Sequence, residues 1–190
     1  MSAPPAIDPT ARTLVAGMGN IFLGDDAFGV RTARALADRP LPAQVEVADI
    51  GVRGVHLAYR LLDGYDTLVL VDATARGGPP GTLYVIEHED DATAVAEAAG
   101  APLDGHRMTP DAVLAHLAAL CAGTGSRPPR RILVVGCEPA CLDEGMELSE
   151  PVSGAVPRAV RLVEELLTAA PDVPPDPTPA GHAAKRGETP

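Results

Sequence analysis

Three residues of this sequence could form a metal site: Asp26 at a predicted helix start, Asp72 at the end of an apolar strand and His106 in a predicted loop. Two carboxylates and one imidazole form an oxygen–nitrogen ligand set that suits a divalent transition metal, nickel included. Because the three residues come from distant segments, a common site requires that the fold bring them to one edge of the molecule.

Each candidate also has a simpler explanation when it is considered alone. Asp25 and Asp26 precede a helical pattern, where aspartate commonly caps the helix and complements its dipole. Asp72 and Asp49 each end an apolar strand, where an Asx turn accounts for aspartate. His106 stands in a predicted loop, where a single histidine is more often unremarkable than a ligand. Against these explanations, ligands of open α/β sheets bind beyond the carboxyl ends of strands, where the candidates lie.

A glycine-containing turn, Gly17-Met18-Gly19-Asn20-Ile21-Phe22, follows the first apolar stretch. The glycines are explained equally well by a tight turn or by a functional loop. A dinucleotide-binding loop has a third glycine where Phe22 stands, and the pair Asp25-Asp26 opposes a phosphate at this place. The sequence thus predicts no nucleotide cofactor, with a nucleotide-binding α/β module kept as an alternative.

The cysteines, Cys121, Cys137 and Cys141, form no disulfide framework and fit a reducing cytoplasm. Cys137 and Cys141 lack two further soft ligands for a structural zinc site. Cys137 follows a predicted strand, as a nucleophile could, but ordinary free thiols are the favoured interpretation. Neither the GxSxG nor the HExxH motif is present.

Composition limits the class of protein. Hydrophobic residues make up 46% of the 190 residues and aromatics only 3%, so the core must be aliphatic, which suits a parallel sheet covered by helices. The formal charge of −11 argues against a nucleic-acid partner and against an anionic membrane surface. No apolar stretch is long enough to span a bilayer, and the N-terminus lacks a secretory signal. A cytoplasmic location is expected.

Hydrophobic periodicity predicts strands and helices in alternation. Apolar or alternating strands are expected at residues 13–16, 45–48, 67–71, 82–86 and 132–136, and helices at 30–37, 55–62, 109–121 and 152–167. Ser149 could cap the last helix, in which Pro157 either introduces a kink or marks the true start. The order predicts a three-layer α/β/α sandwich with a five-stranded, mostly parallel twisted sheet. We expect a flexible N-terminus (1–12), a single domain (13–170) and a disordered Pro-rich tail (171–190).

The stretch from Gly17 to Val30, GMGNIFLGDDAFGV, resembles the signature of the hydrogenase maturation endopeptidases. That signature joins GxGN to an acidic pair and a following glycine. The apolar strand ending in Asp72, the Gly105-His106 segment and Gly136-Cys137-Glu138-Pro139 are similar to later parts of the family pattern. The resemblance covers about residues 13–167.

The resemblance implies an endopeptidase that removes the C-terminal extension from the nickel-loaded precursor of a [NiFe]-hydrogenase large subunit. It assigns metal binding and catalysis to Asp26, Asp72 and His106, with the nickel recognised in the substrate. Gly19, Asn20 and Asp49 are expected to contact the substrate. The resemblance leaves open whether a metal or a carboxylate activates water, and a non-catalytic hydrogenase assembly chaperone remains the other alternative.

Two positions depart from the family pattern. Asp26 stands where relatives often have Glu, and is one methylene shorter. The loop from Asp49 to Gly54 reads DIGVRG, whereas relatives often have DGGTxG, so Val52 takes the place of the threonine. The family pattern therefore does not define the substrate contacts of that loop.

Overall fold

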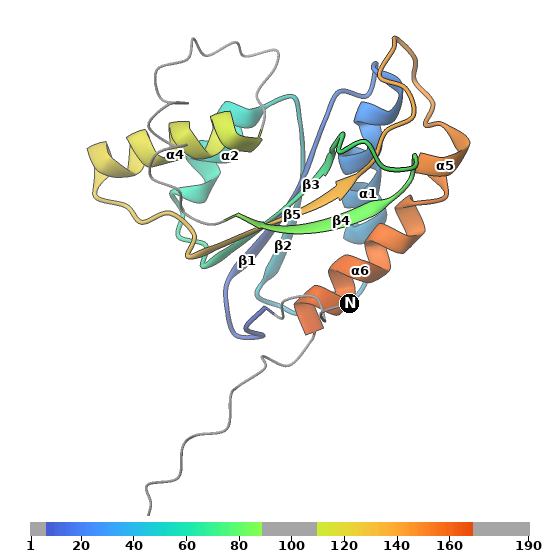
Figure 1. Cartoon of the computed structure of the whole chain (residues 1–190). Helices are drawn as coiled ribbons and strands as arrows, with labels where there is room; N and C mark the ends of the chain where they lie inside the picture. Colours follow the sequence, from blue (N-terminus) through green and yellow to red (C-terminus); the bar gives the residue numbers. More distant parts are fainter. Residues whose placement is uncertain (1–6, 89–109, 169–190) are drawn as a thin grey trace, which may run out of the picture.

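Five strands form one twisted sheet in the order β2-β1-β3-β5-β4 in the computed structural model, which describes residues 7–88 and 110–168 (Figure 1). The strands are β1 (Thr13–Met18), β2 (Val45–Gly51), β3 (Thr67–Ala73), β4 (Leu83–His88) and β5 (Arg131–Cys137). Strands β2, β1, β3 and β5 are parallel, and β4 pairs antiparallel with β5 at the edge. The predicted five-stranded, mostly parallel sheet is confirmed.

The helices cover both faces of this sheet. They are the 3-10 turn η1 (Gly24–Ala27), α1 (Phe28–Ala37), α2 (Gly54–Leu61), α4 (Pro110–Thr124), α5 (Glu150–Ser153) and α6 (Val156–Thr168). The predicted C-terminal helix is divided, and Pro157 lies in the first turn of α6 rather than at a kink. Proline is tolerated there because first-turn amides have no intrahelical acceptor. Among the described helices, none is long and apolar enough to cross a bilayer.

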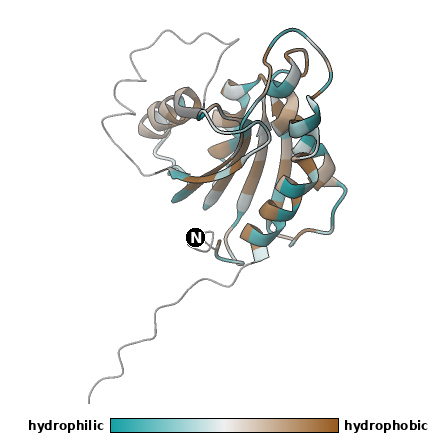
Figure 2. Cartoon of the chain, turned by 45° about the vertical axis from the view of Figure 1, so that its right-hand side comes forward, coloured by the Kyte–Doolittle hydropathy of each residue, from teal (hydrophilic) through white to brown (hydrophobic). Residues whose placement is uncertain are grey.

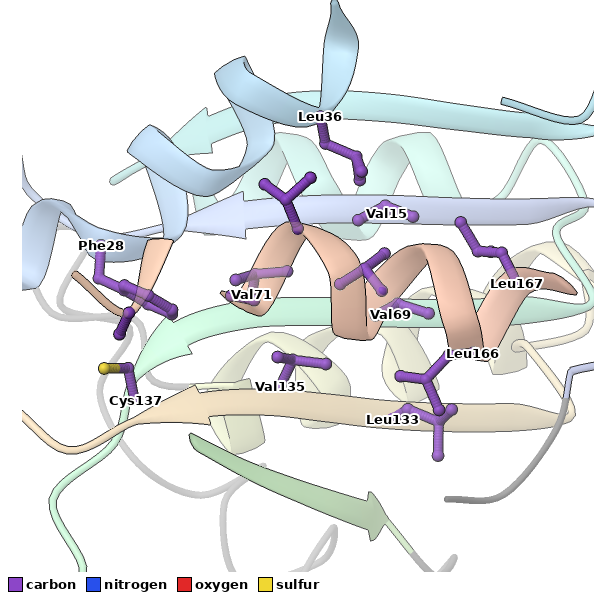
Figure 3. Close-up of a cluster of buried hydrophobic side chains, with 14 of the residues drawn as sticks. Val15, Phe28, Leu36, Val69, Val71, Leu133, Val135, Cys137, Leu166 and Leu167 are labelled. Atoms are coloured by element: carbon purple, nitrogen blue, oxygen red, sulfur yellow. The ribbon is translucent and has the colours of Figure 1, made fainter. Parts of the chain in front are cut away.

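Alternate residues of each central strand point to opposite helical layers, as a strand period of two requires. One cluster joins Val15, Val69 and Val71 of the sheet to α1 and α6, through side chains such as Phe28, Leu36, Leu166 and Leu167 (Figure 3). The other joins Leu14, Leu68 and Ile132 to α2 and α4. Figure 2 shows the apolar side of α6 toward the sheet and its polar side outward. Burial on both faces explains why β1 and β3 are almost continuously apolar.

Two glycines allow α1 to lie directly on the sheet backbone. A Cβ atom at Gly29 would overlap the carbonyl oxygens of Val71 and Met18, and one at Gly17 would overlap the carbonyl oxygen of Gly29. Only a residue without a side chain fits such a contact. The close packing sets η1, which directly precedes α1, over the carboxyl ends of β1 and β3.

The chain segment before β1 packs beside the last helix. The Ile7 amide donates to the Leu166 carbonyl at 3.1 Å, and the Ile7 side chain is buried in the cluster that α6 covers. Residues 1–6 and the tail 171–190 lie outside the described residues. The predicted division into terminus, domain and tail stays a prediction.

Candidate active site

Asp26 lies in η1, where the loop after β1 wraps closely around it. Its carboxylate Oδ2 accepts the Asn20 amide at 2.6 Å. Gly19 holds a positive φ of 119°, and a Cβ there would overlap the Asp26 carbonyl oxygen. The GxGN turn therefore orients the Asp26 carboxylate, which gives its glycine and asparagine a definite structural role.

Asp72 lies near the carboxyl end of β3 and is half-buried. Burial and the nearby charge of Asp26 raise the pKa of Asp72 to about 7, although the Ala73 amide, which donates to Oδ1 at 2.9 Å, partly opposes the shift. Near neutral pH this carboxyl group thus exists in both protonation states. The charge of Asp26 thus disfavours ionisation of Asp72, which places the two carboxyl groups close enough to interact.

The structure therefore brings together two of the three predicted catalytic and metal-binding residues, Asp26 and Asp72. His106 lies outside the described residues, so the complete set stays a prediction. Within residues 7–88 and 110–168, no three His, Cys, Asp or Glu side chains are grouped to hold a metal. A metal held between Asp26 and Asp72 needs a further ligand from elsewhere, as His106 would supply.

Asp25 points away from this pair and holds a distant part of the chain. Its buried carboxylate accepts the amides of Ala140 (2.8 Å) and Cys141 (3.0 Å), and both the amide and hydroxyl of Ser149 (2.7 and 2.9 Å). Burial disfavours the charged form, but these hydrogen bonds outweigh it and hold the pKa of Asp25 below its ordinary value.

Helix capping is thus the wrong explanation for the acidic pair. The N-cap of α1 is Ala27, with no side-chain cap bond. Ser149 does occupy the N-cap position of α5, yet its hydroxyl donates to Asp25 instead. Local sequence favoured capping because the partners of Asp25 lie far along the chain.

Glu138, a buried carboxylate at the end of β5, also escaped prediction as a functional residue. It accepts the amides of Arg76 (2.8 Å) and Gly77 (3.0 Å) and the hydroxyl of Tyr84 (2.9 Å). Burial opposes ionisation, but these bonds lower the pKa of Glu138. They hold the loop that follows Asp72, so Glu138 positions the strand end of the site. An acidic residue directly after an apolar strand was the available signal.

The predicted substrate-binding residues are held by other contacts. The Asn20 Oδ1 accepts the Phe22 amide at 3.0 Å, and Asp49 forms a salt bridge with Arg34 of α1 at 2.8 Å. Gly19 donates its amide to the Gly51 carbonyl at 3.1 Å, which joins the loops after β1 and β2. Substrate contacts by Gly19, Asn20 and Asp49 stay predictions.

All three cysteines are free, as predicted. Burial raises the pKa of the Cys137 thiol to about 11, so it stays protonated near neutral pH and is a poor nucleophile. Cys141 is exposed and its Sγ lies 3.3 Å from a carboxylate oxygen of Asp143. Asp26 and Asp72 therefore stay the candidate catalytic groups at this edge.

Comparison with known proteins identifies the family of this site. The model of the HycI hydrogenase maturation protease family matches residues 30–166. The chain belongs to the hydrogenase maturation protease family. This maturation protease is 32% identical over 162 residues to the hydrogenase expression/formation protein HupD of Rhizobium leguminosarum bv. viciae, covering 84% of this chain and 75% of that protein. It is 30% identical over 154 residues to the hydrogenase 2 maturation protease of Escherichia coli, covering 80% of this chain and 88% of that one.

Solved structures agree with this assignment. The hydrogenase maturating endopeptidase HybD from E. coli superposes with a TM-score of 0.63 at 30% identity, covering 80% of this maturation protease and 89% of that chain. The hydrogenase 2 maturation peptidase from Thaumarchaeota archaeon SCGC_AB-539-E09 gives a TM-score of 0.62 at 33% identity, covering 83% and 98%. The predicted family, fold and peptidase class are confirmed.

The glycine loop of the protease is unsuited to phosphate. A phosphate-binding loop presents free backbone amides to its ligand. Here the Asn20 amide binds Asp26, the Phe22 amide binds the Asn20 side chain and the Gly24 amide binds the Gly145 carbonyl. The nucleotide-binding alternative therefore loses its structural basis.

Proposed function

We propose that this protease removes the C-terminal extension from the nickel-loaded precursor of a [NiFe]-hydrogenase large subunit. Family membership supplies the reaction class, since its relatives are named as hydrogenase maturation proteases. The observation that carries the proposal is the closeness of two carboxyl groups, Asp26 and Asp72, at the carboxyl edge of the sheet, where the charge of Asp26 disfavours ionisation of Asp72. Peptide hydrolysis needs such a group, able to accept and return a proton.

The raised pKa of Asp72 suits it to general acid–base work. A catalytic group is most effective when its pKa lies near the working pH, and that of Asp72 is raised to about 7. In the proposed reaction, ionised Asp72 takes a proton from water as the water oxygen adds to the scissile carbonyl. The protonated carboxyl then gives that proton to the departing amine. Asp26 is oriented by the Asn20 amide, and its charge helps to raise the pKa of Asp72 into the range that this proton exchange needs.

We further propose that the nickel belongs to the substrate and is recognised by Asp26, Asp72 and His106. Two neighbouring carboxylates fit this role, because a cation relieves the repulsion that raises the pKa of Asp72. With the cation bound, that pKa would fall, so the metal would then activate the water in place of Asp72. An imidazole would complete an oxygen–nitrogen ligand set suited to nickel. When bound there, the metal would polarise a nearby carbonyl.

The test is incubation of the protein with nickel-loaded and nickel-free large-subunit precursor from the source organism, followed by mass spectrometry of the precursor C-terminus. We expect one shortened product from the nickel-loaded form only. Asp26→Asn and Asp72→Asn should each abolish shortening while the protein stays folded. Binding of the precursor with no shortening by the parent protein would favour the assembly-chaperone alternative and overturn the protease assignment.

We propose the cytoplasm as the place of reaction. Cys141 is an exposed free thiol, and free thiols persist in a reducing compartment. Detection of the cleaved large subunit in the cytoplasmic fraction of source cells tests this location; a product confined to another fraction contradicts it.

A further inference from the structure

Three exposed apolar side chains lie on the loops beside the carboxyl pair. Phe22 is 59% exposed, Leu142 49% and Met146 60%, which places them among the few large apolar side chains that the described chain exposes. Single exposed apolar residues are ordinary, but a group on adjoining loops marks an interaction site. We call Phe22, Leu142 and Met146 the apolar rim.

The two loops that carry the apolar rim are joined by backbone hydrogen bonds. The Gly145 amide donates to the Phe22 carbonyl at 2.9 Å, the Gly24 amide to the Gly145 carbonyl at 2.8 Å and the Asp25 amide to the Cys141 carbonyl at 3.0 Å. Figure 1 shows the orange loop before α5 running beside the blue loop after β1. These bonds fix the backbone at Phe22 and directly before Leu142 and Met146. The rim is therefore held in place by the same contacts that build the site.

The apolar rim also borders the proposed reaction centre. Phe22 lies four residues before Asp26 in the chain, and Asn20 contacts both, through its amide to Asp26 and its side chain to the Phe22 amide. Phe22 is therefore linked to Asp26 through a single intervening residue. This continuity with the site separates the rim from another exposed aromatic residue, Tyr59, which lies on α2 and stacks edge-on with His116 of α4.

Acidic residues adjoin two members of the apolar rim, Leu142 and Met146, in the chain. The loop that carries Leu142 and Met146 also carries Asp143, Glu144 and Glu147, and Glu150 follows it. None of these four carboxylates forms a salt bridge within the described parts of the chain. The neighbouring Arg31 instead donates to the Met146 carbonyl at 3.2 Å. Carboxylates without an ion pair around an apolar patch favour a partner that is apolar in the centre and basic at its edges.

We propose that the apolar rim binds a segment of the hydrogenase precursor in which apolar residues are flanked by Lys or Arg. This inference rests on the proposed function and names the chemistry of the substrate that the site recognises. A second copy of the chain is a poor occupant, because each copy carries a formal charge of −11 and three side chains are too few for a stable dimer.

The first experiment compares cleavage of the nickel-loaded precursor by the parent and by a Phe22→Ser/Leu142→Ser/Met146→Ser variant. We expect KM to rise about tenfold or more with kcat nearly unchanged, since the rim binds substrate without touching the reacting atoms. Tyr59→Ser is the matched control: it also removes an exposed aromatic side chain and should leave KM unchanged. Thermal unfolding should show both variants folded. Parent-like KM in the triple variant overturns the proposal.

The second experiment measures binding without cleavage and so separates the two proposals. In the Asp72→Asn background, titration calorimetry with uncut precursor should show binding that weakens at high salt and is lost in the triple variant. If this binding is found but the parent never cleaves the precursor, the proposed function fails and the docking surface stands. If the parent cleaves and the rim variant binds equally well, only the docking surface fails. A parent dimer in sedimentation that the triple variant loses would assign the rim to a second copy and overturn the proposal.

Discussion

Asp25 and Ser149, which are 124 residues apart, are joined by two hydrogen bonds to the same carboxylate. Oδ1 accepts the Ser149 amide at 2.7 Å and Oδ2 accepts the Ser149 hydroxyl at 2.9 Å. The contact links the loop that carries Asp26 to the start of α5. The neighbouring residues Asp25 and Asp26 therefore have different roles: Asp25 holds the loops together, and Asp26 faces the proposed reaction centre.

Replacing Asp25 by Ala should destabilise the protein strongly. The change leaves the amides of Ala140, Cys141 and Ser149 without their acceptor, and losing these hydrogen bonds to a charged group costs on the order of 3 kcal/mol together. The free energy of unfolding from urea titration at pH 7 measures this loss. Asp26→Ala is the matched control, because it removes the neighbouring carboxylate, which among the described residues accepts only the Asn20 amide, and should cost about 1 kcal/mol or less. Equal losses in the two variants would contradict the division of roles.

Replacing Asp72 by Asn should stabilise the metal-free protein, and increasingly so as pH rises. The pKa of Asp72 is raised in the folded state to about 7 from 3.8, so folding is favoured when this group is protonated. That contribution is fully present below about pH 4 and is lost as pH rises through 7. Asn stays neutral throughout, so the advantage of the variant should grow by on the order of 2 kcal/mol between pH 5 and pH 8.

The measurement is urea unfolding of both proteins across this pH range with a chelator present. The pKa of Asp25 is instead lowered in the folded state, so the contribution of Asp25 to stability changes with pH in the opposite direction. Its contribution is present above about pH 4 and is lost as pH falls. An advantage of Asp72→Asn that is constant with pH would show that burial and Asp26 do not perturb this group.

Replacing Gly29 by Ala should separate α1 from the sheet. The added methyl group would overlap the carbonyl oxygens of Val71 and Met18, and backbone atoms cannot move aside as a flexible side chain can. We expect a loss of about 2–4 kcal/mol in the free energy of unfolding, with weakened cleavage in the folded fraction. Gly123→Ala in α4 is the control, since a Cβ there meets no atom and Ala favours a helix. Comparable stability of both variants would contradict the close packing of α1.

His106→Ala should abolish precursor cleavage and leave the protein folded. A predicted loop histidine contributes little to core packing, whereas a neutral imidazole is well suited to nickel. Cleavage by the parent should decline at acidic pH, because a protonated imidazole cannot coordinate a metal. His116→Ala is the control: this helix residue contacts Tyr59 and should affect packing alone. Parent-like cleavage by His106→Ala would remove this histidine from the site.

The sequence predicted the elements whose signal is local. Apolar runs such as residues 67–71 identified the strands, since a strand buried on both faces needs no polar alternation. The antiparallel pairing of β4 and the division of the last helix before Pro157 depend on neighbours from other segments, so periodicity left them open. The positions of Asp26 and Asp72 near the ends of predicted strands were enough to predict that both lie at one edge of the sheet, because the carboxyl ends of parallel strands meet there.

Long-range hydrogen bonds account for what the sequence did not reveal. Asp25 was expected to cap a helix because its true partner, Ser149, is far along the chain. Glu138 was seen only as part of a family pattern, because its three donors come from the loop after β3 and from β4. In both cases the residue type was informative, but its partners could not be inferred from spacing.

The contact between Ile7 and Leu166 has a consequence for synthesis of the chain. Helix α6 covers one face of the sheet together with α1, and its last turn anchors the first described residue. On the ribosome, each of the five strands emerges before that helix, so the growing chain exposes the apolar side chains of Val15, Val69 and Leu133 on this face until α6 has been made. A truncated polypeptide that ends before Val156 should aggregate and should show no partial enzymatic activity.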